Sequence, residues 1–203
     1  MESIVPPSQP LEQHPKPPQD FKQRELSIIE ISNPLFRIHD QEYSALHFSR
    51  SGTGRFDGVK QDYGICYTGL DEYVAFIECF GRTLGNRAVE ESALNRKLLS
   101  SISSEKSLRI ADITGNSLTK IGADARISTG SYLTSRAWAN AIFKHPSKPD
   151  GIYYRSRHDD SKFCCGLFDS AKDQLVETSL GNLLQDHRQL LGKILDHYKF
   201  GLI

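Results

Sequence analysis

GICYTGLDEYVAFIECF, residues 64–80, is the stretch that decides the fold class of this chain. Residues 64–68 begin on one glycine and precede another, and their β-favouring side chains predict a strand. Residues 71–80 predict a helix, because Asp71 and Glu72 suit its first turn and the apolar side chains after them recur with helical spacing. The chain therefore passes almost directly from a strand into a helix, and it mixes both kinds of element.

Glu78 is the one acidic residue in the apolar part of this predicted helix. A carboxylate in a largely buried helix costs free energy unless it is paired or has a function. One interpretation is a structural ion pair with Arg82, which follows one helical turn later. The other is a functional site, and the residues alone leave both interpretations open.

The elements on either side of this stretch place the chain in the α+β class. Strands are predicted at residues 35–38, 64–68, 107–113, 151–156 and 164–168, and helices at residues 71–80, 131–143 and 183–198. Because strands and helices do not alternate regularly, a mixed sheet core with flanking helices is favoured over a doubly wound sheet. The last helix is amphipathic with both charge signs on its polar face, which favours a core or homodimer face over a membrane surface.

The amino-terminal region has a different composition from the rest. Six of the nine prolines lie within residues 1–20, with few apolar side chains between them. Such a segment cannot bury enough surface to offset its ordering entropy. We therefore expect a disordered arm over residues 1–25 and one domain over residues 26–203, which includes the carboxy-terminal amphipathic helix. A proline-rich docking peptide is the alternative for the arm.

Charge and apolar runs exclude several classes of partner. Lysine plus arginine equal aspartate plus glutamate at 25 each, so the chain lacks the positive field with which proteins gather nucleic-acid phosphates. No apolar run predicts a membrane span or a secretory signal, so we expect a cytoplasmic protein with no direct nucleic-acid or membrane partner. The four cysteines lack Cys-x-x-Cys spacing and are expected to be reduced, with no metal site. His158, followed by two aspartates, is expected to lie in a solvated hairpin turn.

Arg55 belongs to the glycine-rich block SRSGTGRFDG, residues 49–58. Its glycines allow a close backbone approach to a ligand, and its arginines offer planar forks that suit phosphate or carboxylate oxygens. Neither a P-loop nor a Rossmann fingerprint is present. On its residues alone the block predicts either an anion site or a surface turn with solvated arginines.

Several short motifs, in a fixed order over residues 33–170, resemble the RES domain family, which is named for its Arg, Glu and Ser. They are Leu-Phe-Arg (35–37), Gly-Arg-Phe (54–56), Cys-Tyr-Thr (66–68), the helix with Glu78, Gly-Ile-Tyr-Tyr-Arg-Ser-Arg-His (151–158) and Gly-Leu-Phe-Asp (166–169). The resemblance puts the family's site residues on Arg55, Tyr67, Glu78 and Ser156, with Arg37 matching a second family arginine. The chain departs from the family at 56–57, where tryptophan and asparagine often follow the arginine.

The resemblance also implies a fold and an activity. The fold is similar to that of ADP-ribosyltransferases, and the activity is that of a toxin of a toxin–antitoxin pair that degrades NAD⁺ by hydrolysis or phosphorolysis of the nicotinamide–ribose bond. NAD⁺ is then a substrate, no separate cofactor is needed, and a cognate antitoxin is the expected protein partner. Protein ADP-ribosylation and a catalytically inert RES-like binding module are the alternatives.

The expected roles follow from the chemistry of that bond. Its cleavage builds positive charge on the ribose, which the carboxylate of Glu78 would stabilise. Arg55, helped by Arg37, would hold the pyrophosphate. Tyr67 would contact the nicotinamide side, and Ser156 would add a hydroxyl hydrogen bond to the substrate or to an incoming water or phosphate.

Overall fold

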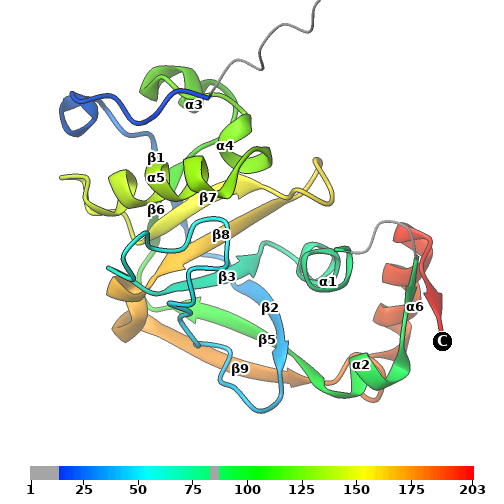
Figure 1. The fold of residues 1–203 in the computed structure, drawn as a ribbon. Coiled ribbons are helices and arrows are strands. Elements are labelled where there is room, and N and C mark those ends of the chain that lie inside the picture. Colours follow the sequence, from blue (N-terminus) through cyan, green and yellow to red (C-terminus); the bar gives the residue numbers. More distant parts are fainter. Residues whose placement is uncertain (1–13, 83–86) are drawn as a thin grey trace, which may run out of the picture.

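The computed structural model describes residues 14–82 and 87–203 (Figure 1). Its centre is an eight-stranded sheet made of β1 (Ile28–Ile31), β2 (Leu35–Asp40), β3 (Ile65–Gly69), β5 (Lys97–Ser104), β6 (Leu108–Asp112), β7 (Gly151–Arg155), β8 (Phe163–Phe168) and β9 (Leu175–Gly181). The strand order is β1-β6-β7-β8-β3-β2-β5-β9, and only β6 and β7 run parallel. Short strands β4 (Ala88–Val89) and β10 (Gly201–Leu202) form a separate parallel pair. The predicted α+β class with a mixed sheet is confirmed.

The helices form two groups around the sheet (Figure 1). The connection between the parallel strands β6 and β7 carries α3 (Gly115–Ile121), α4 (Arg126–Thr129) and α5 (Tyr132–Phe143). A second group consists of α1 (Glu72–Phe80), α2 (Glu91–Asn95) and α6 (Arg188–Tyr198), and two 3-10 turns are η1 (Phe21–Gln23) and η2 (Asp169–Gln174). A parallel pair of strands needs a long crossover connection. The helices of this crossover, α3–α5, cover one face of the sheet (Figure 1).

The strand-to-helix stretch folds as its residues predict. Asp71 caps α1, since its side chain accepts a hydrogen bond of 2.8 Å from the backbone N–H of Val74. Gly69 permits the tight passage from β3, because a Cβ there would lie 2.4 Å from Cγ1 of Val74. The apolar side of α1 is buried, and Glu78 lies on the same helix with an intermediate exposure.

The carboxy-terminal helix is shorter than the sequence predicts. The side-chain oxygen of Asn182 accepts hydrogen bonds from the backbone N–H groups of Leu184 and Gln185, which holds this segment in a turn until α6 begins. Leu191 and Ile194 of α6 are buried in a core shared with α1 and α2. These side chains of the helix therefore belong to the core of its own chain, and the expected homodimer stays a prediction.

The two faces of the central sheet contribute to different apolar cores. Adjacent residues of a strand point to opposite faces. On β3, Tyr67 packs with Ile65 against the core beneath α3–α5, whereas Cys66 lies in a second core with Leu35 and Leu167. A side chain on the Tyr67 face can therefore reach α5, and one on the Cys66 face cannot.

Residues 14–25 differ from the disorder that their composition predicts. Phe21 is 3% exposed and packs edge-to-face on Trp138, with ring centroids 5.5 Å apart. The indole N–H of Trp138 donates a hydrogen bond of 2.9 Å to the carbonyl of Pro15. A few aromatic contacts thus order a segment that has little apolar surface of its own. The remainder of the predicted arm, residues 1–13, lies outside the described residues.

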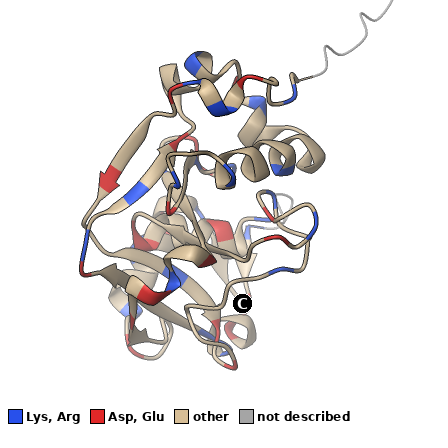
Figure 2. Cartoon of the chain, turned by 90° about the vertical axis from the view of Figure 1, so that its left-hand side faces the viewer, with Lys and Arg blue, Asp and Glu red and all other residues tan. Residues whose placement is uncertain are grey.

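In the view of Figure 2, neither charge sign gathers in one cluster over the described residues. Figure 2 shows lysine and arginine interspersed with aspartate and glutamate over the elements seen in that view. Across residues 14–82 and 87–203, no helix is long and apolar enough to cross a membrane, and no group of three or more metal-ligating side chains comes together. All four cysteines are free thiols, and Cys66, Cys164 and Cys165 are buried.

Candidate functional site

Glu78 and Ser156 meet where α1 faces the end of β7. The Ser156 hydroxyl donates a hydrogen bond of 2.6 Å to Oε1 of Glu78, and its oxygen accepts two of 3.1 Å from the backbone N–H groups of His158 and Asp159. Ser156 is 3% exposed. Among the described residues no ion pair joins Glu78 to Arg82, so the partner of Glu78 is the serine. The turn after β7 thus orients a half-buried carboxylate.

Arg55 is a buried cation that lies against α5, and its side chain is part of a residue that is 8% exposed. Its Nη1 donates to the carbonyl of Gly130 at 2.8 Å and to the hydroxyl of Ser135 at 3.2 Å. Its guanidinium carbon lies 4.5 Å from the ring centroid of Tyr132. Burial lowers the pKa of Arg55. Tyr132 opposes this effect and raises the pKa, whereas the positive charge of Arg157 lowers it further. The guanidinium nevertheless stays charged and has further N–H donors to offer an anion.

Tyr67 fixes the turn that carries Arg55. Its hydroxyl donates to Oδ1 of Asp57 at 2.8 Å and accepts from the backbone N–H of Phe56 at 2.9 Å. Oδ2 of Asp57 accepts from the backbone N–H of Gly54 at 2.9 Å. A Cβ on Gly54 would lie 2.3 Å from Oδ1 of Asp57, so only glycine fits there. The Tyr67 hydroxyl is therefore engaged within the protein, which leaves its ring for contact with a substrate.

Replacing Tyr67 by Phe is expected to lower the free energy of unfolding by about 1–3 kcal/mol, because the buried carboxylate of Asp57 and the N–H of Phe56 each lose a partner. Urea denaturation followed by circular dichroism measures this change. Tyr43→Phe is the matched control, since Tyr43 is 58% exposed. Equal denaturation midpoints for the Tyr67 variant and the wild type would contradict this role of the hydroxyl.

Arg37 lies away from these residues. Its Nη1 donates to the carbonyls of Ala45 at 2.8 Å and His47 at 2.9 Å, and it lies 2.7 Å from Sγ of Cys66. Cys66 points to the sheet face opposite Tyr67, so the structure brings Arg37 to the second core and its covering loop. We correct the expectation that Arg37 helps Arg55 at one site, because strand alternation separates them.

The Glu78 site, which we define as Arg55, Tyr67, Glu78 and Ser156, has neighbours that the sequence did not assign to a site. They are Tyr132, Tyr154, Arg157 and His158. Burial raises the pKa of Tyr154 well above its ordinary value, and the charge of Glu78 and the Tyr67 side chain are among the groups that act on it. Arg157 and His158 follow Ser156 within the same sequence motif, so the motif could have indicated that they lie at the site. Tyr132 belongs to α5, and no sequence motif connects it with the other site residues.

His158 was expected to lie in a solvated turn, but its side chain is half-buried beside Glu78. Burial lowers the pKa of His158 from its ordinary value of 6.5, Glu78 opposes this effect, and Arg157 adds to it. Because the folded protein binds this proton less tightly than the unfolded chain does, the histidine lowers stability as the pH falls through 6.5 towards its folded pKa.

The imidazole of His158 is therefore expected to titrate below 6.5, and in Glu78→Gln its pKa should fall further, because the attraction of the carboxylate is lost. NMR titration of the imidazole, assigned by its absence in His158→Asn, measures both values. A titration above the ordinary value, or a rise in the Glu78 variant, would be the opposite result.

The fold and the site together define an α+β protein in which a glutamate bound by a serine and a buried arginine both act on one histidine beside a mixed sheet. The chain belongs to the RES domain family, which matches residues 34–187. A protein of Sinorhizobium fredii named Probable toxin y4kH is 31% identical over 105 residues, or 51% of this chain and 80% of that protein.

A solved structure shares this fold. A chain of the crystal structure of the M. tuberculosis MbcT–MbcA toxin–antitoxin complex aligns with a TM-score of 0.67 and 16% identity. The alignment covers 86% of this chain and 98% of that chain. At 16% identity this match shows a shared fold only, and the shared fold covers nearly all of the compared chain.

Proposed function

We propose that this RES domain protein is the toxin of a toxin–antitoxin pair and cleaves the nicotinamide–ribose bond of NAD⁺. The observation that carries the proposal is the half-buried carboxylate of Glu78, which Ser156 orients at 2.6 Å and which lies close enough to the buried Arg55 that both act on the pKa of His158. The relatives support the toxin role, since one is named a probable toxin and the other comes from a toxin–antitoxin complex. A cognate antitoxin is the partner that this role requires.

The proposed chemistry needs a negative charge beside the ribose. When the bond breaks, its electron pair goes to the nicotinamide nitrogen, so nicotinamide leaves as a neutral molecule and no general acid is required. The ribose becomes an oxocarbenium ion, and Glu78 stabilises the developing charge. Water, which gives up a proton to the solvent, or inorganic phosphate then adds to the ribose and gives ADP-ribose or its 1-phosphate.

The remaining residues bind and orient the dinucleotide. Arg55 is held by Gly130 and Ser135 through Nη1, so its other N–H groups can meet a pyrophosphate oxygen without reorganisation. Tyr67 offers its ring to the nicotinamide side, because its hydroxyl is engaged by Asp57. Ser156 fixes the rotamer of the Glu78 carboxylate, which places its charge before the substrate arrives.

Nicotinamide release from NAD⁺ by the purified protein, freed of any antitoxin, tests the proposal. We expect release with no ADP-ribose left on protein, and parallel reactions with and without inorganic phosphate separate phosphorolysis from hydrolysis by the product formed. ADP-ribose attached to a protein would instead identify a transferase. Absence of release would leave the inert binding module as the function of this domain.

A further inference from the structure

The residues that hold Arg55 all come from one short segment, which runs from the end of α4 into α5. Gly130 contributes its carbonyl, Tyr132 its ring and Ser135 its hydroxyl. The orientation of the guanidinium therefore depends on where this segment lies. Any element that holds α4 and α5 in place against the domain therefore also fixes the position of the Arg55 guanidinium.

Residues 14–24, which we call the N-terminal strap, are such an element. His14 has a 5% exposed side chain, with Nε2 3.4 Å from Oδ1 of Asp124 just before α4. Pro15 accepts the indole hydrogen bond of Trp138 at 2.9 Å, and the ring of Phe21 packs against the same indole. Arg24 donates at 3.1 Å to the carbonyl of Ile121 at the end of α3. The strap thus contacts the end of α3, the turn before α4, and α5.

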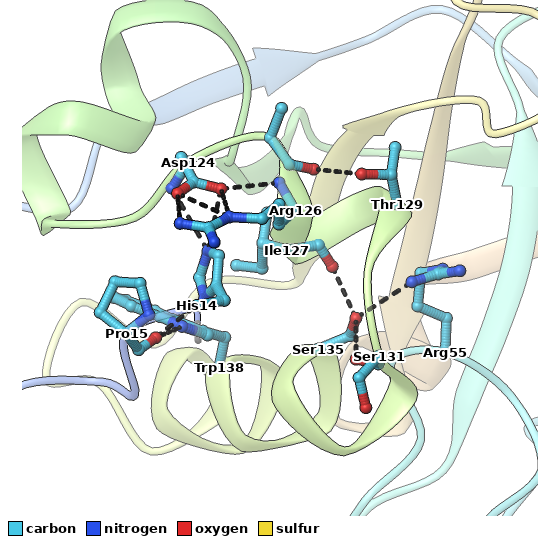
Figure 3. A network of polar contacts seen from close by, with 11 residues as sticks. His14, Pro15, Arg55, Asp124, Arg126, Ile127, Thr129, Ser131, Ser135 and Trp138 are labelled. Carbon is cyan, nitrogen blue, oxygen red and sulfur yellow. Dashed lines mark hydrogen bonds and ion pairs between the residues drawn. The ribbon is translucent and has the colours of Figure 1, made fainter. Parts of the chain in front are cut away.

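Figure 3 shows two groups of polar contacts, one at the strap and one at Arg55, which the backbone of α4 connects between Arg126 and Ile127. Asp124 binds the guanidinium of Arg126 in α4 at 2.7 Å, and these hydrogen bonds lower the pKa of Asp124 to about 2. The hydroxyl of Ser135, in α5, donates to the carbonyl of Ile127, in α4, at 2.6 Å and accepts from Arg55. Ser135 is fully buried, so the two helices and the arginine share a single hydrogen-bonded contact.

We propose that the N-terminal strap is a positioning element for Arg55, acting through Trp138 and the α4–α5 segment. The strap lies before residue 34, where the match to the RES domain begins. The consequence for NAD⁺ rests on the proposed function. Because a misplacement of about 1 Å can cost about 100-fold in rate, a loosened strap should weaken the contact of Arg55 with the pyrophosphate.

The competing explanation is that the strap only adds stability. Phe21→Leu and Phe21→Ala test this, because both remove the ring contact with Trp138 but keep different amounts of apolar packing. The milder change preserves the fold if the larger one does not. Leu175→Ala is the matched control, since Leu175 is buried at 7% exposure in the core on the opposite sheet face. All variants should lower the melting temperature.

Hydrogen exchange and fluorescence measure the coupling without a substrate. Trp138 is the single tryptophan of the chain, so its emission reports strap docking directly. In the Phe21 variants we expect red-shifted emission and faster amide exchange over residues 126–135, whereas Leu175→Ala should leave both unchanged. Unchanged exchange over residues 126–135 in both Phe21 variants would overturn the proposal.

Kinetics then connect the strap to Arg55. We expect the Phe21 variants to raise the KM for NAD⁺ by about tenfold with a smaller effect on kcat, a split typical of lost binding. In an Arg55→Ala background, Phe21→Leu should raise KM no further, because the residue through which the strap acts is gone. Additive effects, or faster exchange with an unchanged KM, would show a structural role only.

The role of the strap can be tested whether or not the protein cleaves NAD⁺. If the wild-type protein does not cleave NAD⁺, the proposed activity fails, while exchange and the Nε–H NMR signal of Arg55, assigned with Arg55→Lys, still test the strap. Phe21→Leu should shift or broaden that signal. An unperturbed signal would overturn the positioning role whatever the substrate is.

Discussion

Glu78→Gln is expected to lower kcat for NAD⁺ cleavage by about 10²–10³-fold, the usual cost of removing one preorganised electrostatic group. Glutamine has the same shape, so the Ser156 hydroxyl can donate to its amide oxygen as it does to the carboxylate. What is lost is the negative charge that meets the oxocarbenium ion. KM should change little, because the effect belongs to the transition state.

Single-turnover release of nicotinamide measures this loss, and circular dichroism shows whether the variant is folded. Glu72→Gln is the matched control, because it changes the same residue type at the other end of α1. The control should keep the wild-type kcat. A folded Glu78→Gln protein with wild-type turnover would remove Glu78 from the chemistry.

Arg55→Ala is expected to raise the KM for NAD⁺ by about 10- to 100-fold, since a hydrogen bond to a charged group contributes about 1.5–3 kcal/mol. Arg55→Lys should recover only part of this loss, because an ammonium group keeps the charge but not the planar fork. The loss should appear in binding more than in kcat, as the pyrophosphate is remote from the bond that breaks.

Steady-state kinetics and calorimetric titration of NAD⁺ measure the effect of the arginine. Arg50→Ala provides a control from the same glycine-rich block, because Arg50 is half-exposed and pairs with Asp169. The Arg50 variant should keep the wild-type KM. An unaltered affinity in Arg55→Ala would exclude this arginine from the phosphate contact and leave its hydrogen bonds with Gly130 and Ser135 as its role.

Much of the candidate site could be anticipated because its parts are short and local. The helix that carries Glu78 follows from an aspartate cap and an apolar repeat, both set by residues within a few positions of one another. The turn of Arg55 is likewise local, since Gly54, Asp57 and their hydrogen bond lie within one short segment. Ser156 could be anticipated only through the family motif, as its bond to Glu78 joins residues 78 positions apart.

Local backbone preferences and the spacing of apolar side chains are enough to predict the α+β class, the passage from β3 into α1 and the carboxylate on an apolar helix. The folded chain was needed to see that Arg37 faces the second core, that His158 is half-buried beside Glu78, and that the strap docks on Trp138. These contacts depend on strand alternation, sheet pairing and aromatic packing, which join residues far apart in the chain. The same long-range packing places Arg55, and not Arg37, in the Glu78 site.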